Sequence, residues 1–300
     1  MTTQKPDDLD AEPEPQSFSD TERYSPSELT SMYLSLKRVY RDLVARVERA
    51  SRGAGGIEST GNQMFWGSVL FTRISVISKS IEKLLPNTKP REHWDFSSLA
   101  ALSRNLVEAV LVYHWLCGDG IDQDVRQGRF ILLYLHDYGS RRRLFPDGDW
   151  EDSVYRDLVA QFDANPYLAT FNEKQRRVAL RGEKTPFVQD DVLIEIGENP
   201  DEFRTTYRFF SQHTHTGPVA FYRMTDHVRG TGVETAHEKR YMMYAIGTAL
   251  TYLSHALKLH ILIFPDAETR RLHLTSQQIE YNVEVEQGRR KPRSDDFRHL

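Results

Sequence analysis

The chain has 300 residues, of which 39% are hydrophobic, 27% charged and 11% aromatic. This is enough apolar material for a sizeable core and too little for a protein with several membrane spans. A single cysteine, Cys117, excludes an intrachain disulfide framework and a cysteine-rich metal site. The N-terminus is acidic and lacks the apolar run of a secretory signal, so we expect a cytoplasmic protein.

The formal net charge of −4 is unevenly distributed along the chain. Residues 1–22 hold seven acidic side chains and one lysine, and without this −6 segment the rest of the chain carries +2. Because the segment has almost no large apolar residues, we expect a disordered acidic tail. Residues 288–300 are also polar, and we expect them to be frayed. Residues 23–287 are predicted to form a single helical domain, whose near-neutral charge does not by itself indicate nucleic acid.

Apolar residues recur at helical spacing along most of this body. The first predicted helix begins at Ser25-Pro26, a capping residue followed by proline, and ends near Arg52, before a glycine-rich break. Further helices are predicted at about 62–85, 95–117, 122–144, 149–163, 167–181, 199–216 and 235–264. The run Val192–Ile196 fits a helix or a strand. Strand-like alternation is nearly absent, so we predict an all-α fold, a bundle of six to nine helices with short helices at its periphery.

One uncharged run raises the question of a membrane. Residues 241–257 carry no formal charge and approach the roughly 18 residues that a membrane-spanning helix requires. The run also contains three tyrosines and a histidine, and Lys258 follows it at once. A central core helix is the better interpretation, and we expect no membrane span.

The most informative segment lies between Asn199 and Pro218. Asn199-Pro200-Asp201-Glu202 is typical of a helix start, and Gly217-Pro218 is a strong stop. Within the helix, spacings of 4, 3 and 4 place four polar side chains on one face: Arg204, Arg208, Ser211 and His215. Such a stripe can bind an anion or a phosphate. Alternatively, it is a solvated or core-edge face on which the hydroxyl and the imidazole satisfy each other.

Other polar patterns carry less information. Arg104 and Glu108 lie four residues apart among apolar residues, which predicts an ion pair, either structural or at the edge of a polar pocket. Glu234-x-x-His237 is only half of a di-iron motif, so we expect no metal and no cofactor. Three basic clusters most simply decorate solvated helix ends, and would form an RNA surface only if the fold brought them together. These clusters are Arg141–Arg143, Lys174–Arg177 with Arg181, and Arg270–Arg271.

Two short motifs carry a family resemblance. Arg104-x3-Glu108 on one helix and Tyr207-x3-Ser211-x3-His215 on a later one resemble a bacterial all-helical family of unknown function, over about residues 60–265. More distantly, the helical build and Arg208-x4-His213 are similar to HEPN domains. Many HEPN domains are metal-independent ribonucleases of toxin–antitoxin and phage-defence systems, with an Arg-x4–6-His motif at a dimer interface. Active members commonly have a polar residue after the arginine, where this chain has Phe209.

The unknown-function family implies a helical fold and no established activity, and the residues together with the HEPN resemblance leave two alternative functions open. The first is a HEPN-like metal-independent ribonuclease, or an RNA- or phosphate-binding protein, of a bacterial defence or toxin-type system. In it Arg208 stabilises charge on the phosphate, and His213 or His215 acts as general acid or base. The second is a non-enzymatic binding or scaffold module in which the same side chains hold helices in register. The expected binding residues are Arg104, Glu108, Arg204, Tyr207 and Ser211. Expected partners are RNA, a second copy of the chain, or another protein.

Overall fold

A computed structural model describes residues 24–89, 91–148, 150, 152–183, 189–215, 217–222 and 232–269. Within these ranges the chain forms ten α-helices and one short 3-10 helix, and it contains no strand. The all-α prediction is therefore confirmed. The predicted tails at residues 1–22 and 288–300 lie outside the described residues.

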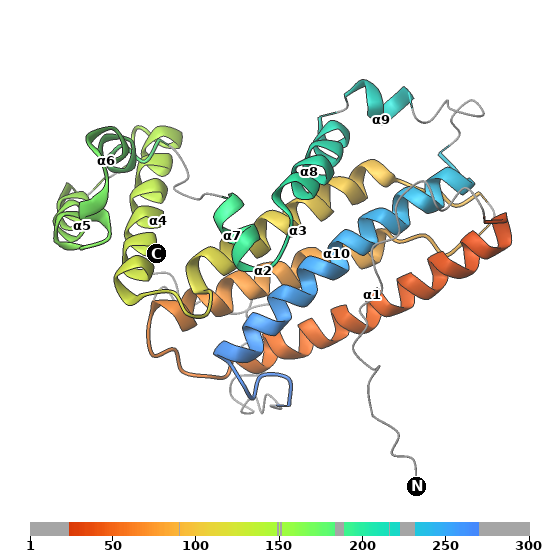
Figure 1. Cartoon of the computed structure of the whole chain (residues 1–300), viewed down its shortest axis with the longest axis horizontal. Coiled ribbons are helices and arrows are strands. Elements are labelled where there is room, and N and C mark those ends of the chain that lie inside the picture. The colour runs from red at the N-terminus through yellow and green to blue at the C-terminus, as the bar shows by residue number, and fades with distance from the viewer. Residues whose placement is uncertain are drawn as a thin grey trace, which may run out of the picture.

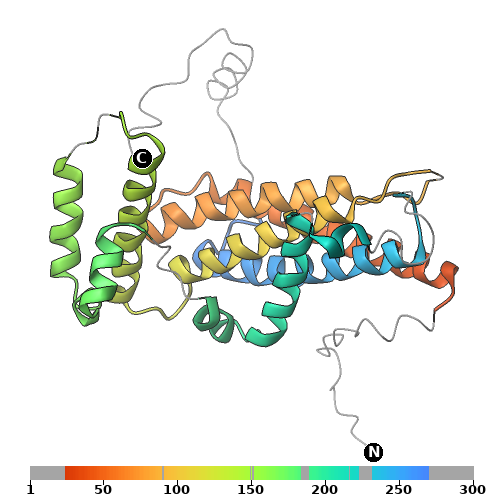
Figure 2. The ribbon, with the colours of Figure 1, turned by 90° about the horizontal axis from the view of Figure 1, so that it is seen from above.

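Four long helices form the central bundle: α1 (Pro26–Ala54), α2 (Asn62–Leu84), α3 (Phe96–Cys117) and α10 (Ala236–Ile263). They run alongside one another in Figures 1 and 2, and both α1 and α3 pack against α2 and α10. Large side chains that are completely buried fill the space between them: Tyr40, Phe71, Phe96, Tyr113 and Ile246. Because each of these helices turns an apolar stripe toward the others, the bundle encloses a continuous hydrophobic core.

The last long helix, α10, is a core helix, as its composition predicts. In the part of the chain that the structure describes, it is the one helix long and apolar enough to cross a membrane. It nevertheless contacts α1, α2 and α3, and buries Met242, Ile246 and Leu253 among them. The long apolar surface of α10 is therefore packed against three neighbouring helices.

The ends of the bundle are fixed by specific local contacts. At the start of α1, Ser25 and Glu28 form a reciprocal capping box. At its end, Gly53 lies so close to the chain after α10 that a β-carbon there would stand 1.8 Å from the carbonyl oxygen of Ala267. Only glycine fits at this contact, which ties the first helix to the segment that follows the last one.

Three further helices form a lobe at one end of the bundle (Figure 1): α4 (Gln123–Leu144), α5 (Asp152–Ala164) and α6 (Glu173–Leu180). α5 and α6 both pack against α4. The single helix predicted at 167–181 is in fact a 3-10 helix, Leu168–Thr170, followed by α6. Asn172 divides them, because its side chain forms a capping box with Gln175 and so begins a new helix.

The remaining helices lie on the outside of the bundle. α7 (Gln189–Glu195) shows that most of the ambiguous apolar run is helical. Asn199 then caps α8 (Pro200–Thr214), as its sequence predicts, and α8 packs along α3. A five-residue helix that the sequence did not indicate, α9 (Pro218–Tyr222), follows α8. The packing of α8 on α3 positions every predicted site residue.

Candidate functional site

α8 has two chemically different faces. Phe203, Phe210 and His213 are buried, whereas Arg208 and His215 are exposed. With 3.6 residues per turn, the first of these histidines lies about 140° around the helix from Arg208, and the second only about 20° from it. The two candidate histidines therefore lie on opposite sides of one helix.

The outward face keeps part of the predicted polar stripe. Arg208 is exposed and has no hydrogen bond or ion pair with any residue that the structure describes. Arg204 instead forms ion pairs with Asp190 and Asp201, which neutralise its guanidinium. The Ser211 hydroxyl donates to the carbonyl oxygen of Tyr207 at 2.7 Å. Of the four residues of the stripe, Arg208 and His215 are thus the two that remain accessible to a ligand.

His213 belongs to the core. Its side chain is 3% exposed, and its Nδ1 lies 3.4 Å from the Ser97 hydroxyl on α3. The ring packs edge-on against Phe96, with centroids 4.7 Å apart, and against Phe209, with centroids 5.0 Å apart. Phe209 in turn stacks on Tyr241 of α10. The aromatic residue at position 209, which departs from the HEPN pattern, is explained by this packing.

A second polar contact joins α3 to α8. The Arg104 guanidinium donates to Glu108 Oε1 at 3.1 Å and to the Tyr207 hydroxyl at 2.6 Å, and the same hydroxyl donates to Glu108 Oε1. The guanidinium also lies 4.6 Å from the centroid of the Tyr207 ring. The predicted ion pair thus forms, and a tyrosine from another helix completes it.

The contact between these three residues shifts the pKa values of two of them, Tyr207 and Arg104. Burial, followed by the hydrogen bond to Glu108, raises the pKa of Tyr207. Burial opposes the charge on Arg104, but the hydrogen bonds and the attraction of Glu108 outweigh it, so the pKa of Arg104 is raised. The side chains of Arg104 and Glu108 are 20% and 37% exposed. The three side chains hydrogen-bond to one another across the two helices, which suits a helix-to-helix connection.

We expect the Tyr207→Phe change to lower the free energy of unfolding by about 1–2 kcal/mol, because it removes a hydrogen bond to a charged group while keeping the ring. In an Arg104→Met background the same change should cost about 0.5 kcal/mol less, since the hydroxyl then makes one charged hydrogen bond, to Glu108, in place of two. Urea denaturation of the four proteins in the cycle measures this coupling. Strictly additive effects would show that Tyr207 and Arg104 do not stabilise each other.

A further polar pair, which the sequence does not indicate, joins α10 to the residue before Asn199. His255 of α10 contacts Glu198, just before α8, with 2.9 Å between Nε2 and Oε1. His114 of α3 lies beside it, with ring centroids 6.3 Å apart. No spacing rule joins residues so far apart in the chain. In the ranges that the structure describes, no group of three or more His, Cys, Asp or Glu side chains could hold a metal ion.

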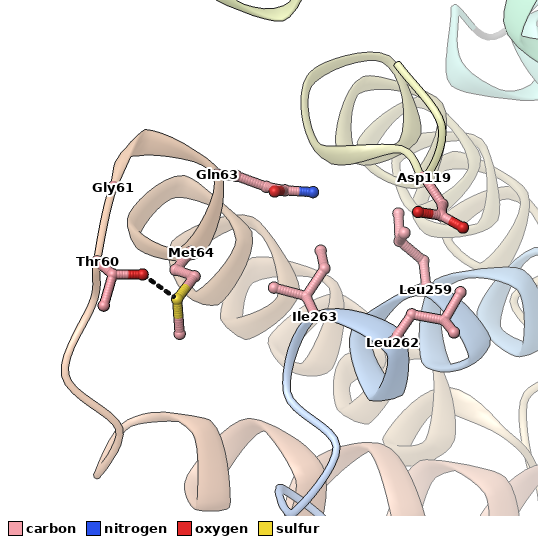
Figure 3. Close-up of a pocket in the computed structure, with 8 residues that line it drawn as sticks. All are labelled: Thr60, Gly61, Gln63, Met64, Asp119, Leu259, Leu262 and Ile263. Carbon is pink, nitrogen blue, oxygen red and sulfur yellow. Dashed lines mark hydrogen bonds between the residues drawn. The ribbon is translucent and has the colours of Figure 1, made fainter. Parts of the chain in front are cut away.

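An open pocket of about 370 Å³ lies elsewhere, at one end of the bundle (Figure 3). Its lining combines the start of α2, the end of α10 and Asp119 after α3. The residues that line it are Thr60, Gly61, Gln63, Met64, Asp119, Leu259, Leu262 and Ile263. The amide of Gln63 is already bonded to the carbonyl oxygen of Cys117. None of the predicted site residues reaches this pocket.

Fold and site together define an all-helical protein in which a peripheral helix, α8, is joined to the core helix α3 by buried and half-buried polar contacts. The chain belongs to the family described as "Family of unknown function (DUF5677)", whose model matches residues 64–231. The matched segment includes α3 and α8, and with them every candidate site residue. Neither the curated proteins nor the solved structures contained a match to the chain.

Proposed function

We propose that this chain is a non-catalytic helical module that binds RNA, or another phosphate-bearing ligand, through the outward face of α8. One observation carries the proposal. Cleavage by one copy of the chain needs a histidine within reach of the phosphate that Arg208 holds, but His213 lies on the opposite, buried side of the helix and His215 lies about 10 Å further along its axis. What remains on the accessible side is suited to binding.

The outward face offers two groups to a phosphate. Arg208 is exposed and free of carboxylate partners among the described residues, so its guanidinium can form paired hydrogen bonds with phosphate oxygens. His215 lies seven residues further on, about 10 Å along the helix axis. Two separated basic groups on one helix face can contact successive phosphates of a single strand.

The buried residues have a different task in this proposal. Arg104, Glu108 and Tyr207 hydrogen-bond to one another between α3 and α8. His213 fills an aromatic cage between the same two helices. These contacts fix the rotation of α8 about its own axis, and that rotation decides which of its side chains face outward.

A second candidate is cleavage of RNA without a metal, as in the HEPN ribonucleases that the chain distantly resembles. It is favoured by the exposure of His215 on the same side of α8 as Arg208. In this alternative His215 serves as the general acid or base, and a second copy of the chain completes the site at a dimer interface. A toxin or defence system would be the setting for such an activity.

We expect Arg208→Ala to weaken the binding of a fluorescent single-stranded RNA about fivefold or more, and to reduce the slope of log K against log salt by about 0.7, the value for one phosphate contact. Fluorescence anisotropy in excess chelator measures both quantities. Arg38→Ala is the matched control, because Arg38 is an exposed arginine of α1. If the two variants bind alike, α8 does not contact the RNA.

A further inference from the structure

The open pocket at the end of the bundle is framed by helices that contact one another (Figure 3). Gly67, early in α2, packs against the end of α10, since a β-carbon there would lie 3.7 Å from Cδ1 of Ile263. Gln63, also in α2, reaches the end of α3, where its Nε2 donates to the carbonyl oxygen of Cys117 at 2.9 Å. The ends of α2, α3 and α10 therefore hold the walls of the pocket in place.

A carboxylate stands at the rim of this pocket. Asp119 belongs to the turn after α3, which includes Gly120 with a φ of +69°, a conformation that favours glycine. The Arg126 guanidinium donates to the carbonyl oxygens of Gly118 at 3.0 Å and Ile121 at 3.4 Å, so it anchors the turn on both sides of Asp119. Asp119 itself is exposed and forms no ion pair with any residue that the structure describes.

The polar side chains of the pocket all offer acceptor oxygens. An ionised carboxylate such as Asp119 only accepts hydrogen bonds. Because Gln63 directs its Nε2 to Cys117, its Oε1 is left without a partner among the described residues. The Thr60 hydroxyl donates to Sδ of Met64 at 3.0 Å, which leaves the lone pairs of its oxygen. A ligand that complements these groups has to supply the donors and the positive charge.

The rest of the lining is apolar. Leu259, Leu262 and Ile263 of α10 form one wall, and the thioether of Met64 lies in the facing wall (Figure 3). Leu259 is only 3% exposed, whereas Leu262 at the rim is 64% exposed and has apolar surface left to cover. The volume of about 370 Å³ falls at the lower end of the range of small-molecule sites. The pocket thus suits a small ligand with an apolar chain.

We infer that this pocket binds a small primary alkylammonium ion, with its N–H groups toward Asp119 and Gln63 and its chain along Leu262. An ammonium group carries three donors and no acceptor, which matches a set of acceptor oxygens. An anionic ligand would be repelled by Asp119. The inference is independent of the proposed function, because no residue of α8 lines the pocket.

The test is a titration of the full chain, with isotope-labelled isoleucine and leucine methyl groups, by hexylammonium and by hexanol. Both should shift the methyl resonances of Ile263, and hexylammonium should bind about fivefold more tightly, because only it pairs with the carboxylate. Asp119→Asn should remove that advantage and leave the affinity for hexanol unchanged. Asp42→Asn is the matched control, since Asp42 is an exposed acid of α1. Equal affinities for the two probes, or an advantage that survives Asp119→Asn, would overturn the inference.

Leu262→Ser tests the apolar wall separately. It should weaken both probes about threefold or more, because each buries its chain against that leucine. Val76→Ser in α2 is the control, since Val76 is 61% exposed and does not line the pocket, and it should change neither affinity. Resonances of Ile263 that stay fixed at every probe concentration would exclude the site. Binding of N-acetyl-lysine methylamide as tight as that of hexylammonium would overturn the choice of a free amine in favour of a peptide lysine.

Discussion

His213→Ala is expected to lower the free energy of unfolding by about 3 kcal/mol, a value typical of removing a large ring from a core. The ring is 3% exposed and packs edge-on against Phe96 and Phe209, so its loss leaves a cavity between α3 and α8. The Ser97 hydroxyl, 3.4 Å from Nδ1, would also lose its partner. Urea denaturation followed by circular dichroism measures the change.

The matched control is two residues away. His215 is exposed at the end of α8, so His215→Ala should change the free energy of unfolding by less than about 0.5 kcal/mol. The same change should weaken RNA binding, whereas folded His213→Ala protein should bind as the unaltered protein does. A destabilised His215→Ala protein together with a fully stable His213→Ala protein would reverse our assignment of the two faces.

Acid is expected to destabilise the protein strongly as the pH falls from 6.5 to 4. Burial lowers the pKa of His260, and burial together with the charge of His255 lowers the pKa of His114, in each case from 6.5 to about 4. The unfolded chain therefore binds more protons than the folded one in this window, so stability falls with pH. Each histidine contributes a loss of up to about 3 kcal/mol at pH 4.

His260→Gln isolates one of these contributions. His260 is fully buried, stacks on Phe71 with ring centroids 3.6 Å apart, and its Nδ1 lies 3.1 Å from the Tyr113 hydroxyl. Glutamine keeps a polar partner for that hydroxyl but does not titrate. Carboxylates affect both proteins equally, so the variant should lose less stability than the unaltered protein between pH 7 and pH 4.5. Parallel stability curves would contradict a titrating His260.

The long helices could be predicted from the sequence because their signals are local. Helical spacing of apolar residues and caps such as Asn199 place most boundaries within a few residues of those observed. The division of the predicted helix at 167–181 was missed because a capping residue, Asn172, interrupts an otherwise helical pattern. The close approach of Gly182, after α6, to Leu135 within α4 joins residues far apart in the chain, and no local pattern predicts it.

The candidate site, like the fold, could be predicted from the sequence only where its signals are local. The pairing of Arg104 with Glu108 follows from their spacing on one helix, and it forms. The contribution of Tyr207 to that pair depends on how α8 lies on α3, which the sequence does not specify. The positions of Phe203 and Phe210 indicate which face of α8 is apolar, and that signal already places His213 nearer the buried side than His215.

The most direct test of the central claim, binding without cleavage, is a single incubation of the unaltered protein with single-stranded RNA in excess chelator. Anisotropy measures complex formation, and a denaturing gel of the same sample measures the length of the RNA. We predict a complex in which the RNA remains intact at every protein concentration. RNA fragments that form with the unaltered protein, and that no longer form with His215→Ala, would contradict the claim.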